Sequence, residues 1–138
     1  PIIGNGDIRT VNQAKKLLND SGVDAVMIGR GALRNPWIFK ECMGLDKNDF
    51  EGPCEVLDHY LELLRAKYDL RNTLISLRKF ISWLVYGYPG AAAFRSAMYH
   101  LFTIDELVQS AHDFFERVVH LPQSKFGPSE KFMASGHG

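Results

Sequence analysis

Two short stretches near the start of the chain, PIIGNGDI (residues 1–8) and VDAVMIGRGALRNPW (residues 23–37), decide the fold of its first part. Each is an apolar run that ends in glycines, a pattern typical of buried strands that run into a loop. Between them, Thr10 and Gln13 have the spacing of a capping box that begins a helix, and Gly22 ends it. This order predicts a parallel, right-handed strand-helix-strand unit with two buried strands.

The loops after the two strands combine small and charged residues. Four glycines in them would let backbone N–H groups approach a dianion: Gly4, Gly6, Gly29 and Gly31. Arg30 would add charge-assisted hydrogen bonds to the same anion. Two such loops, followed by a short extra helix predicted over residues 37–43, are typical of the phosphate site after the last strands of a (β/α)8 barrel. The alternative is that the glycines only permit tight turns.

The remainder of the chain predicts helices only. After a polar linker over residues 45–52, apolar residues recur at helical spacing in four segments. The first segment starts at Pro53, and the second spans residues 72–86. The third carries Phe94, Ala97, Met98 and Leu101, and the fourth begins with the capping box of Thr103 and Glu106. Short loops between amphipathic helices predict a four-helix bundle, so the fold class is α/β plus all-α. The tail, residues 122–138, is rich in Gly, Ser and Pro and is predicted to be disordered.

Composition excludes several classes of protein. With 46% apolar residues the chain can bury a core, and its 16 basic and 16 acidic side chains cancel, which argues against coating nucleic acid or a membrane surface by net charge alone. No apolar run approaches the length of about 20 residues that spans a membrane. Cys42 and Cys54 lack the spacing of a metal or disulfide motif, which predicts free thiols, no metal site and a cytoplasmic location.

Pro1 stands at the start of what reads as a buried strand. A buried strand needs neighbours on both edges, and nothing before Pro1 supplies them. We therefore expect this chain to be the C-terminal piece of a longer protein, with the missing N-terminal portion as its partner.

Basic residues are concentrated between Arg65 and Arg95, where six cations stand against one acid. Within this stretch Lys79, Trp83 and Tyr86 fall on one helical face, with Arg78 beside it. Cations that alternate with rings able to stack on bases are one arrangement that binds RNA. The alternative is an ordinary solvated helix face with half-buried rings.

Three motifs, in this order along the chain, resemble the C-terminal half of a tRNA-dihydrouridine synthase of the bacterial B-type: GNGDI, GVDAVMIGRGALRNPWIF and LRKFISWLVYGYPGAAAFR. The resemblance covers about residues 1–118 and implies an FMN-dependent oxidoreductase. In such an enzyme NADPH reduces FMN, FMN passes a hydride to uridine in tRNA, and a cysteine acid protonates the ring to give 5,6-dihydrouridine. It implies that residues 1–50 are the end of an FMN-binding TIM barrel and residues 51–121 a helical tRNA-binding domain.

The resemblance also assigns residues to the site. It implies that five residues contact FMN, mostly at its phosphate end: Asn5, Gly6, Asp7, Gly29 and Arg30. It favours four residues for RNA binding: Arg78, Lys79, Trp83 and Arg95. One position departs from the family pattern, because Phe80 stands where the family often has His, which argues against a polar role there.

No catalytic residue is expected within the chain. The cysteine acid of the family lies in an Asn-x-Gly-Cys-Pro context, which neither Cys42 nor Cys54 has, so both are interpreted as packing cysteines. The acid is expected upstream of Pro1, and this chain alone is predicted to be inactive. Two other functions stay open at this stage, namely a different FMN-dependent TIM-barrel oxidoreductase acting on a small molecule, or a non-catalytic helical RNA-binding module.

Overall fold

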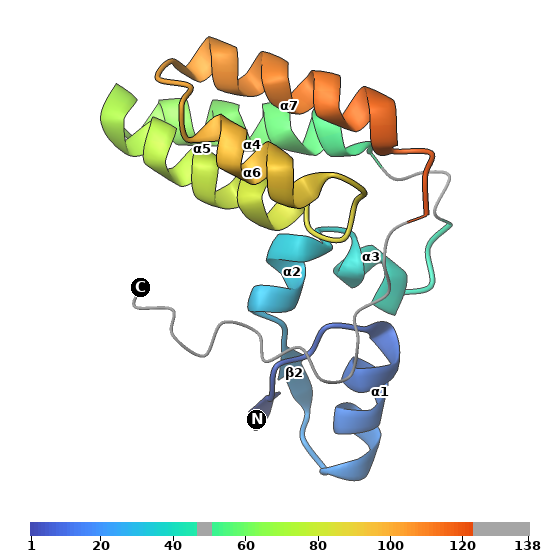
Figure 1. The fold of residues 1–138 in the computed structure, drawn as a ribbon. Helices are drawn as coiled ribbons and strands as arrows, with labels where there is room; N and C mark the ends of the chain where they lie inside the picture. The colour runs from blue at the N-terminus through green and yellow to red at the C-terminus, as the bar shows by residue number, and fades with distance from the viewer. Residues whose placement is uncertain (47–50, 123–138) are drawn as a thin grey trace.

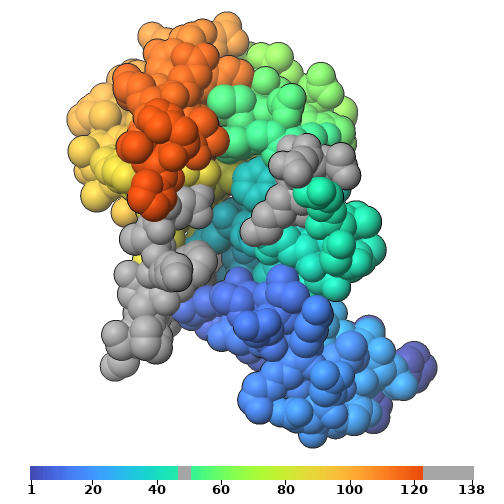
Figure 2. Space-filling view, turned by 90° about the vertical axis from the view of Figure 1, so that its right-hand side faces the viewer, coloured from blue at the N-terminus to red at the C-terminus, as the bar shows by residue number. Residues whose placement is uncertain are grey.

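The computed structural model describes residues 1–46 and 51–122, which form a short two-stranded sheet and a larger helical part. Figure 1 shows the helices α4 to α7 grouped at one end of the molecule and the strands with α1 at the other, with α2 and α3 between them. The space-filling view in Figure 2 shows the same order on another face, with residues of α3 lying between the two ends.

The sheet consists of β1 (Ile3–Asn5) and β2 (Ala25–Met27), joined by α1 (Val11–Asp20). The strands are parallel, with Gly4 opposite Val26, which confirms the predicted crossover unit. The predicted capping box begins α1. The Gln13 amide donates to the Thr10 hydroxyl at 3.3 Å, and the Thr10 amide donates to the Gln13 side-chain oxygen at 3.2 Å.

The prediction that both strands are buried is wrong for this chain. Ile3 and Met27 are 57% and 53% exposed, and Ile2, just before β1, is 65% exposed. Each strand pairs only with the other in the described sheet, and α1 packs against it, so one face and both outer edges are left uncovered.

A second difference lies after β2, where a loop over Gly29, Arg30 and Gly31 is predicted but a helix, α2 (Arg30–Arg34), begins. Two glycines lower the helix propensity of this stretch, which is why the pattern indicates a loop. A tertiary contact explains the glycine inside α2. A Cβ at Gly31 would lie 2.1 Å from the Ile8 carbonyl oxygen, so only glycine lets this turn pack against the chain after β1.

The predicted extra helix follows as α3 (Ile38–Cys42). The Trp37 amide donates to the Asn35 side-chain oxygen at 3.2 Å, and Gly44 ends the segment with a φ of 74°. Trp37 packs against the core of the helical part. The two short helices α2 and α3 thus connect the sheet with the helices that follow.

The helical part comprises α4 (Pro53–Lys67), α5 (Leu70–Leu84), α6 (Ala91–Met98) and α7 (Ile104–Val118). Helix α5 begins two residues before the predicted start because the Asp69 carboxylate accepts the Asn72 amide at 2.7 Å and caps it. The capping box predicted for Thr103 and Glu106 is confirmed. Leu101, predicted within the third helix, lies beyond its end.

One hydrophobic core joins these four helices. Helix α4 packs against α5 and α7, and α7 also packs against α5 and α6. The core includes an aromatic group in which Phe94 stacks on Phe114 at 4.5 Å and Tyr88 meets Phe115 edge to face at 5.7 Å. Helical periodicity predicts Leu57, Leu77 and Leu107 on inward helix faces, and all three are fully buried. Tyr68 and Ala97 belong to the same predicted stripes but are exposed.

Some predictions fall outside the described residues, namely the tail beyond residue 122 and part of the linker before α4. No helix within residues 1–46 and 51–122 is long and apolar enough to cross a membrane. In the same residues, no three His, Cys, Asp or Glu side chains are grouped in a way that could hold a metal ion.

Candidate functional site

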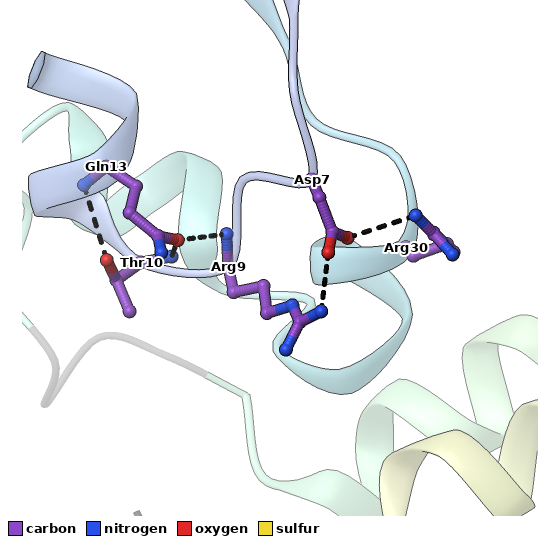
Figure 3. A network of polar contacts seen from close by, with 5 residues as sticks. All are labelled: Asp7, Arg9, Thr10, Gln13 and Arg30. Carbon is purple, nitrogen blue, oxygen red and sulfur yellow. Dashed lines mark hydrogen bonds and ion pairs between the residues drawn. The ribbon is translucent and has the colours of Figure 1, made fainter. Parts of the chain in front are cut away.

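The loops after β1 and β2 meet at the carboxyl end of the sheet. Asp7, after β1, and Arg30, at the start of α2 after β2, form an ion pair in which Arg30 Nη2 lies 3.2 Å from Asp7 Oδ1. Figure 3 shows the Asp7 carboxylate between two arginines, with Arg9 on the other side at 2.5 Å. The structure therefore brings two of the five predicted cofactor residues into direct contact, and Asn5, Gly6 and Gly29 lie in the chain segments that lead to them.

Asp7 is held in a defined position. Its φ of 48° places it in the left-handed region, which Asp enters more readily than most residues, and no other non-glycine residue among those described has a positive φ. The hydrogen bond from Arg9 is the main cause that lowers the pKa of the Asp7 carboxyl below its usual value, against a smaller opposite effect of burial. The carboxylate is therefore ionised at neutral pH and orients both guanidinium groups.

Several guanidinium groups act on the Asp7 carboxylate. Besides Arg9 and Arg30, the charge of Arg34 also lowers the pKa of Asp7, so three guanidinium groups act on one carboxylate. The Arg30 side chain is 52% exposed, whereas that of Arg9 is 18% exposed. The site can therefore attract an anion, and Arg30 is the more accessible of these two cations.

The four glycines of the predicted phosphate loops divide into two pairs. A Cβ at Gly6 or Gly29 would meet nothing within 4 Å, so the backbone faces open space at both. A Cβ at Gly4 would press on Val23 and Leu17 at 3.2–3.3 Å, and Gly31 lies against the Ile8 carbonyl. Gly4 and Gly31 are thus explained by packing within the chain, whereas Gly6 and Gly29 leave room for a ligand.

Sequence reasoning missed Arg9 and Arg34 as members of this site. Arg9 lies two residues after Asp7, a signal that was present but not used. Arg34 lies four residues after Arg30, and residues at this spacing are neighbours on a helix face. Because a loop was predicted at residues 29–31, the proximity of Arg30 and Arg34 was not predicted.

The second group of predicted residues lies near the end of α5. The guanidinium carbon of Arg34 is 3.5 Å from the Tyr86 ring centroid and 5.4 Å from that of Trp83, and the Arg95 guanidinium is 5.8 Å from Tyr86. Trp83 and Tyr86 are half-buried, and α2 packs against α5 here. The rings on this face therefore contact arginines of the chain itself.

The predicted RNA-binding cations differ in their surroundings. Arg78 Nη2 donates a hydrogen bond to the Leu101 carbonyl, which ties α5 to the segment after α6, and its Nε is buried without a hydrogen-bond partner. Lys79 is exposed and makes no hydrogen bond or ion pair within the described residues. Phe80, the position that departs from the family pattern, is buried and packs against Tyr60 in a tilted arrangement with the ring centroids 4.2 Å apart. Arg78 therefore has a structural contact that Lys79 lacks.

The structure describes the surroundings of both cysteines. Cys42 and Cys54 are both free and half-buried. Burial, and then the charges of Asp58 and Glu116, raise the pKa of the Cys54 thiol. His112, which lacked a partner in the sequence, lies 2.9 Å from Asp58 and links α7 to α4; the residues are 54 positions apart, so no local pattern could reveal the pair.

A comparison with known families shows the family of the chain. Residues 1–119 match the dihydrouridine synthase family, a span that includes all three motifs and both groups of predicted residues. The chain belongs to the dihydrouridine synthase family. This membership covers nearly all of the described residues.

Relatives named tRNA-dihydrouridine synthase B agree with this family. The protein of Xanthomonas campestris is 32% identical over 126 residues, and that of Pasteurella multocida is 30% identical over 126 residues; each alignment covers 86% of this chain and 38% of the relative. The chain spans between 29% and 38% of the length of the first relatives that it matches.

Proposed function

We propose that this chain is the C-terminal part of an FMN-dependent tRNA-dihydrouridine synthase, which uses NADPH to reduce uridine in tRNA to 5,6-dihydrouridine. Family membership over residues 1–119 supports the reaction class. The observation that carries the proposal for this chain is the ion pair between Asp7 and Arg30, because it joins the two loops implied to hold the cofactor at a place where three guanidinium groups act on one carboxylate. The two free cysteines support a cytoplasmic location for the intact protein within this proposal.

The residues present fit the phosphate of FMN. Arg30 is accessible and offers a guanidinium fork, and the backbone at Gly6 and Gly29 faces open space. When bound, FMN would supply the hydride chemistry of the reaction. In this proposal Asp7 holds Arg30 in place, Asn5 and the two glycines line the loops, and the catalytic cysteine acid lies in a part of the protein outside this chain.

The proposal gives the two parts of the chain separate tasks. Residues 1–50 would be the last strands of a TIM barrel, and the apolar side chains exposed on β1 and β2 would then pack against the remaining strands. Residues 51–121 would form the helical domain that binds tRNA. Lys79 is the predicted cation that is exposed and makes no hydrogen bond or ion pair among the described residues, whereas Arg78, Trp83 and Arg95 have contacts within the chain.

The test uses the intact protein and the 138-residue chain side by side. Incubated with NADPH and unmodified tRNA, the intact protein should retain flavin and give uridines that gain two hydrogen atoms, measured by mass spectrometry of digested tRNA. The chain alone should neither retain flavin on gel filtration nor modify tRNA. An intact protein that binds tRNA without flavin would support the non-catalytic module instead, and one that reduces only small molecules would support the other oxidoreductase.

A further inference from the structure

A pocket of about 500 Å³ lies at the end of the helical part away from the cofactor loops. It is formed where α4 ends and where α5 and α7 begin, and Leu74 and Ile104 are its more buried apolar residues. Helix α5 has 15 residues and runs from this pocket to the Trp83 end beside α2. At a rise of about 1.5 Å per residue, the two ends of α5 lie on the order of 20 Å apart. The pocket is therefore separate from the site already described.

Two large apolar side chains at this pocket are unusually exposed. Phe102 is 75% and Leu70 78% exposed, although both lie next to the buried core. Phe102 follows α6 and precedes the cap of α7, so its backbone position is set by the capping box, whose Glu106 carboxylate accepts the Phe102 amide at 3.3 Å. The Phe102 ring is therefore exposed to solvent, while its backbone is held in place by the hydrogen bond to Glu106.

Two arginines line the pocket, and their surroundings differ. Arg65 Nη2 lies 3.6 Å from Asp105 Oδ1, and these side chains are 54% and 94% exposed, so the pair is loosely held. Arg71 makes no hydrogen bond or ion pair in the part of the chain that the structure describes. The nearby Asp69 carboxylate is already engaged as the cap of α5. Arg65 and Arg71 also belong to the stretch between residues 65 and 95 that has six cations and one acid.

We propose that this pocket binds one unpaired nucleotide of an RNA, with the base against the Phe102 ring and its phosphate at Arg71. A flat exposed ring with a guanidinium beside it matches a base and its phosphate, and proteins recognise unpaired RNA bases by stacking them on aromatic side chains. The proposal rests on the proposed function, since tRNA is a substrate whose loops contain unpaired bases. An acidic apolar peptide is the competing occupant, and the experiment separates the two.

The experiment measures the affinity of the 138-residue chain for a labelled RNA hairpin with a single-stranded loop and for a fully paired duplex of the same length, by fluorescence anisotropy. Phe102→Ala should weaken hairpin binding by about 5- to 150-fold and leave duplex binding unchanged. Phe102→Trp, which keeps a ring for stacking, should retain hairpin binding. Tyr99→Ala is the matched control, because Tyr99 is 63% exposed in the same connection but does not line the pocket.

Two charge variants test the phosphate. Arg71→Gln should weaken hairpin binding. It should also lower the slope of log affinity against log salt concentration by the amount expected for about one lost phosphate contact. Asp105→Asn should strengthen it about 2- to 5-fold, because a negative charge leaves the rim of the pocket and Arg65 is released. All of these side chains are exposed, so the thermal unfolding temperature of each variant should stay at the wild-type value. An unchanged unfolding temperature would show that the variants fold.

Three results would overturn the proposal. They are an unchanged hairpin affinity in Phe102→Ala, an equal loss for hairpin and duplex, or binding of an acidic apolar peptide that RNA does not displace.

Failure of the proposed function would give different results. If the intact protein reduces uridine in tRNA equally well with Phe102 or Ala at this position, the pocket is refuted and the reaction stands; if hairpin binding follows the predicted pattern but no uridine is reduced, the reaction is refuted and the pocket stands.

Discussion

The guanidinium carbon of Arg34, at the end of α2, lies 3.5 Å from the centroid of the Tyr86 ring, just beyond the end of α5. This contact joins the segment that follows the sheet to the helical part. Arg34 also lowers the pKa of the Asp7 carboxyl, and the guanidinium carbon of Arg95 lies 5.8 Å from the centroid of the same Tyr86 ring. Arg34 thus lies between the two groups of residues predicted to bind cofactor and RNA.

Removing this stacked cation should lower stability. We expect Arg34→Ala to reduce the free energy of unfolding by about 1–2 kcal/mol, because a partly buried cation–π contact and its packing are lost. Arg34→Lys should fall between wild type and Ala, since Lys keeps the charge without the planar stacking group. Denaturant unfolding followed by tryptophan fluorescence measures the effect. Lys15→Ala, an exposed residue of α1, serves as the control, and an equal effect in both variants would argue against the stacking contact.

The close contact at Gly31 predicts a sharper loss. Gly31→Ala would place a methyl group 2.1 Å from the Ile8 carbonyl oxygen, so α2 or the loop after β1 must shift, and we expect a cost of about 1–3 kcal/mol. Gly6→Ala should change the free energy of unfolding by less than about 0.5 kcal/mol, because its added Cβ meets nothing within 4 Å. Equal stability of the two variants, in the same denaturant experiment, would contradict the role assigned to Gly31.

The ion pairs of Asp7 predict a pH dependence. Its pKa is lower in the folded state than in the unfolded chain, so its contribution to stability is complete above the unfolded pKa of about 3.9 and is lost as the pH falls through the folded value. Asp7→Asn should therefore be less stable than wild type at pH 7, and the difference should shrink as the pH falls below about 4. Thermal unfolding at a series of pH values measures this. A difference that stays constant down to pH 2 would show that the carboxylate charge contributes nothing.

Arg30 should contribute to the phosphate end of the cofactor. In the intact protein we expect Arg30→Ala to weaken FMN binding by about 1.5–3 kcal/mol, because a charge-assisted hydrogen bond to the phosphate is lost. Riboflavin lacks the phosphate, so its affinity should change little. Fluorescence titration of both flavins provides the measurement, and Lys16→Ala on α1 controls for a general loss of positive charge. Equal losses for FMN and riboflavin would remove Arg30 from the phosphate site.

Arg78 and Lys79 are neighbours in sequence and should respond differently. Arg78→Ala should lower the unfolding temperature, because the bond to the Leu101 carbonyl between α5 and the segment after α6 is lost. Lys79→Gln should leave the unfolding temperature unchanged and weaken tRNA binding, with a salt slope lower by about 0.7–0.9. Binding at several salt concentrations and thermal unfolding of the same samples distinguish the two. If Lys79→Gln leaves the salt slope unchanged, Lys79 is an ordinary solvated residue.

The sequence predicted the features that depend on local signals. The capping boxes at Thr10 and Thr103 and the burial of most inward residues follow from spacing, and the parallel pairing follows from the strand-helix-strand order; the structure confirms these features. Helix α2 was not predicted, because Gly31 indicates a loop. The structure requires a glycine there since Gly31 packs against the Ile8 carbonyl, more than 20 residues away in the chain.

The candidate site was predictable in part. Residue types in the loops after the strands predicted Arg30 as a site residue and the family resemblance implied Asp7, and the structure shows the two side chains paired. The stacking of Arg34 on Tyr86, the pairing of His112 with Asp58 and the anchoring of Arg78 to Leu101 depend on how separate helices pack. Such contacts leave no periodic or local signal in one sequence.

The two-stranded sheet has a practical consequence for work with this chain in isolation. β1 and β2 each have one outer edge whose backbone N–H and C=O groups meet no other strand of the described sheet, and apolar side chains such as Ile3 and Met27 flank those edges. Open apolar edges are templates for pairing with another copy. At high concentration the chain should therefore self-associate through its sheet. A lysine in place of Ile3 is the simplest way to keep it monomeric, because a charged residue on an edge strand discourages such pairing.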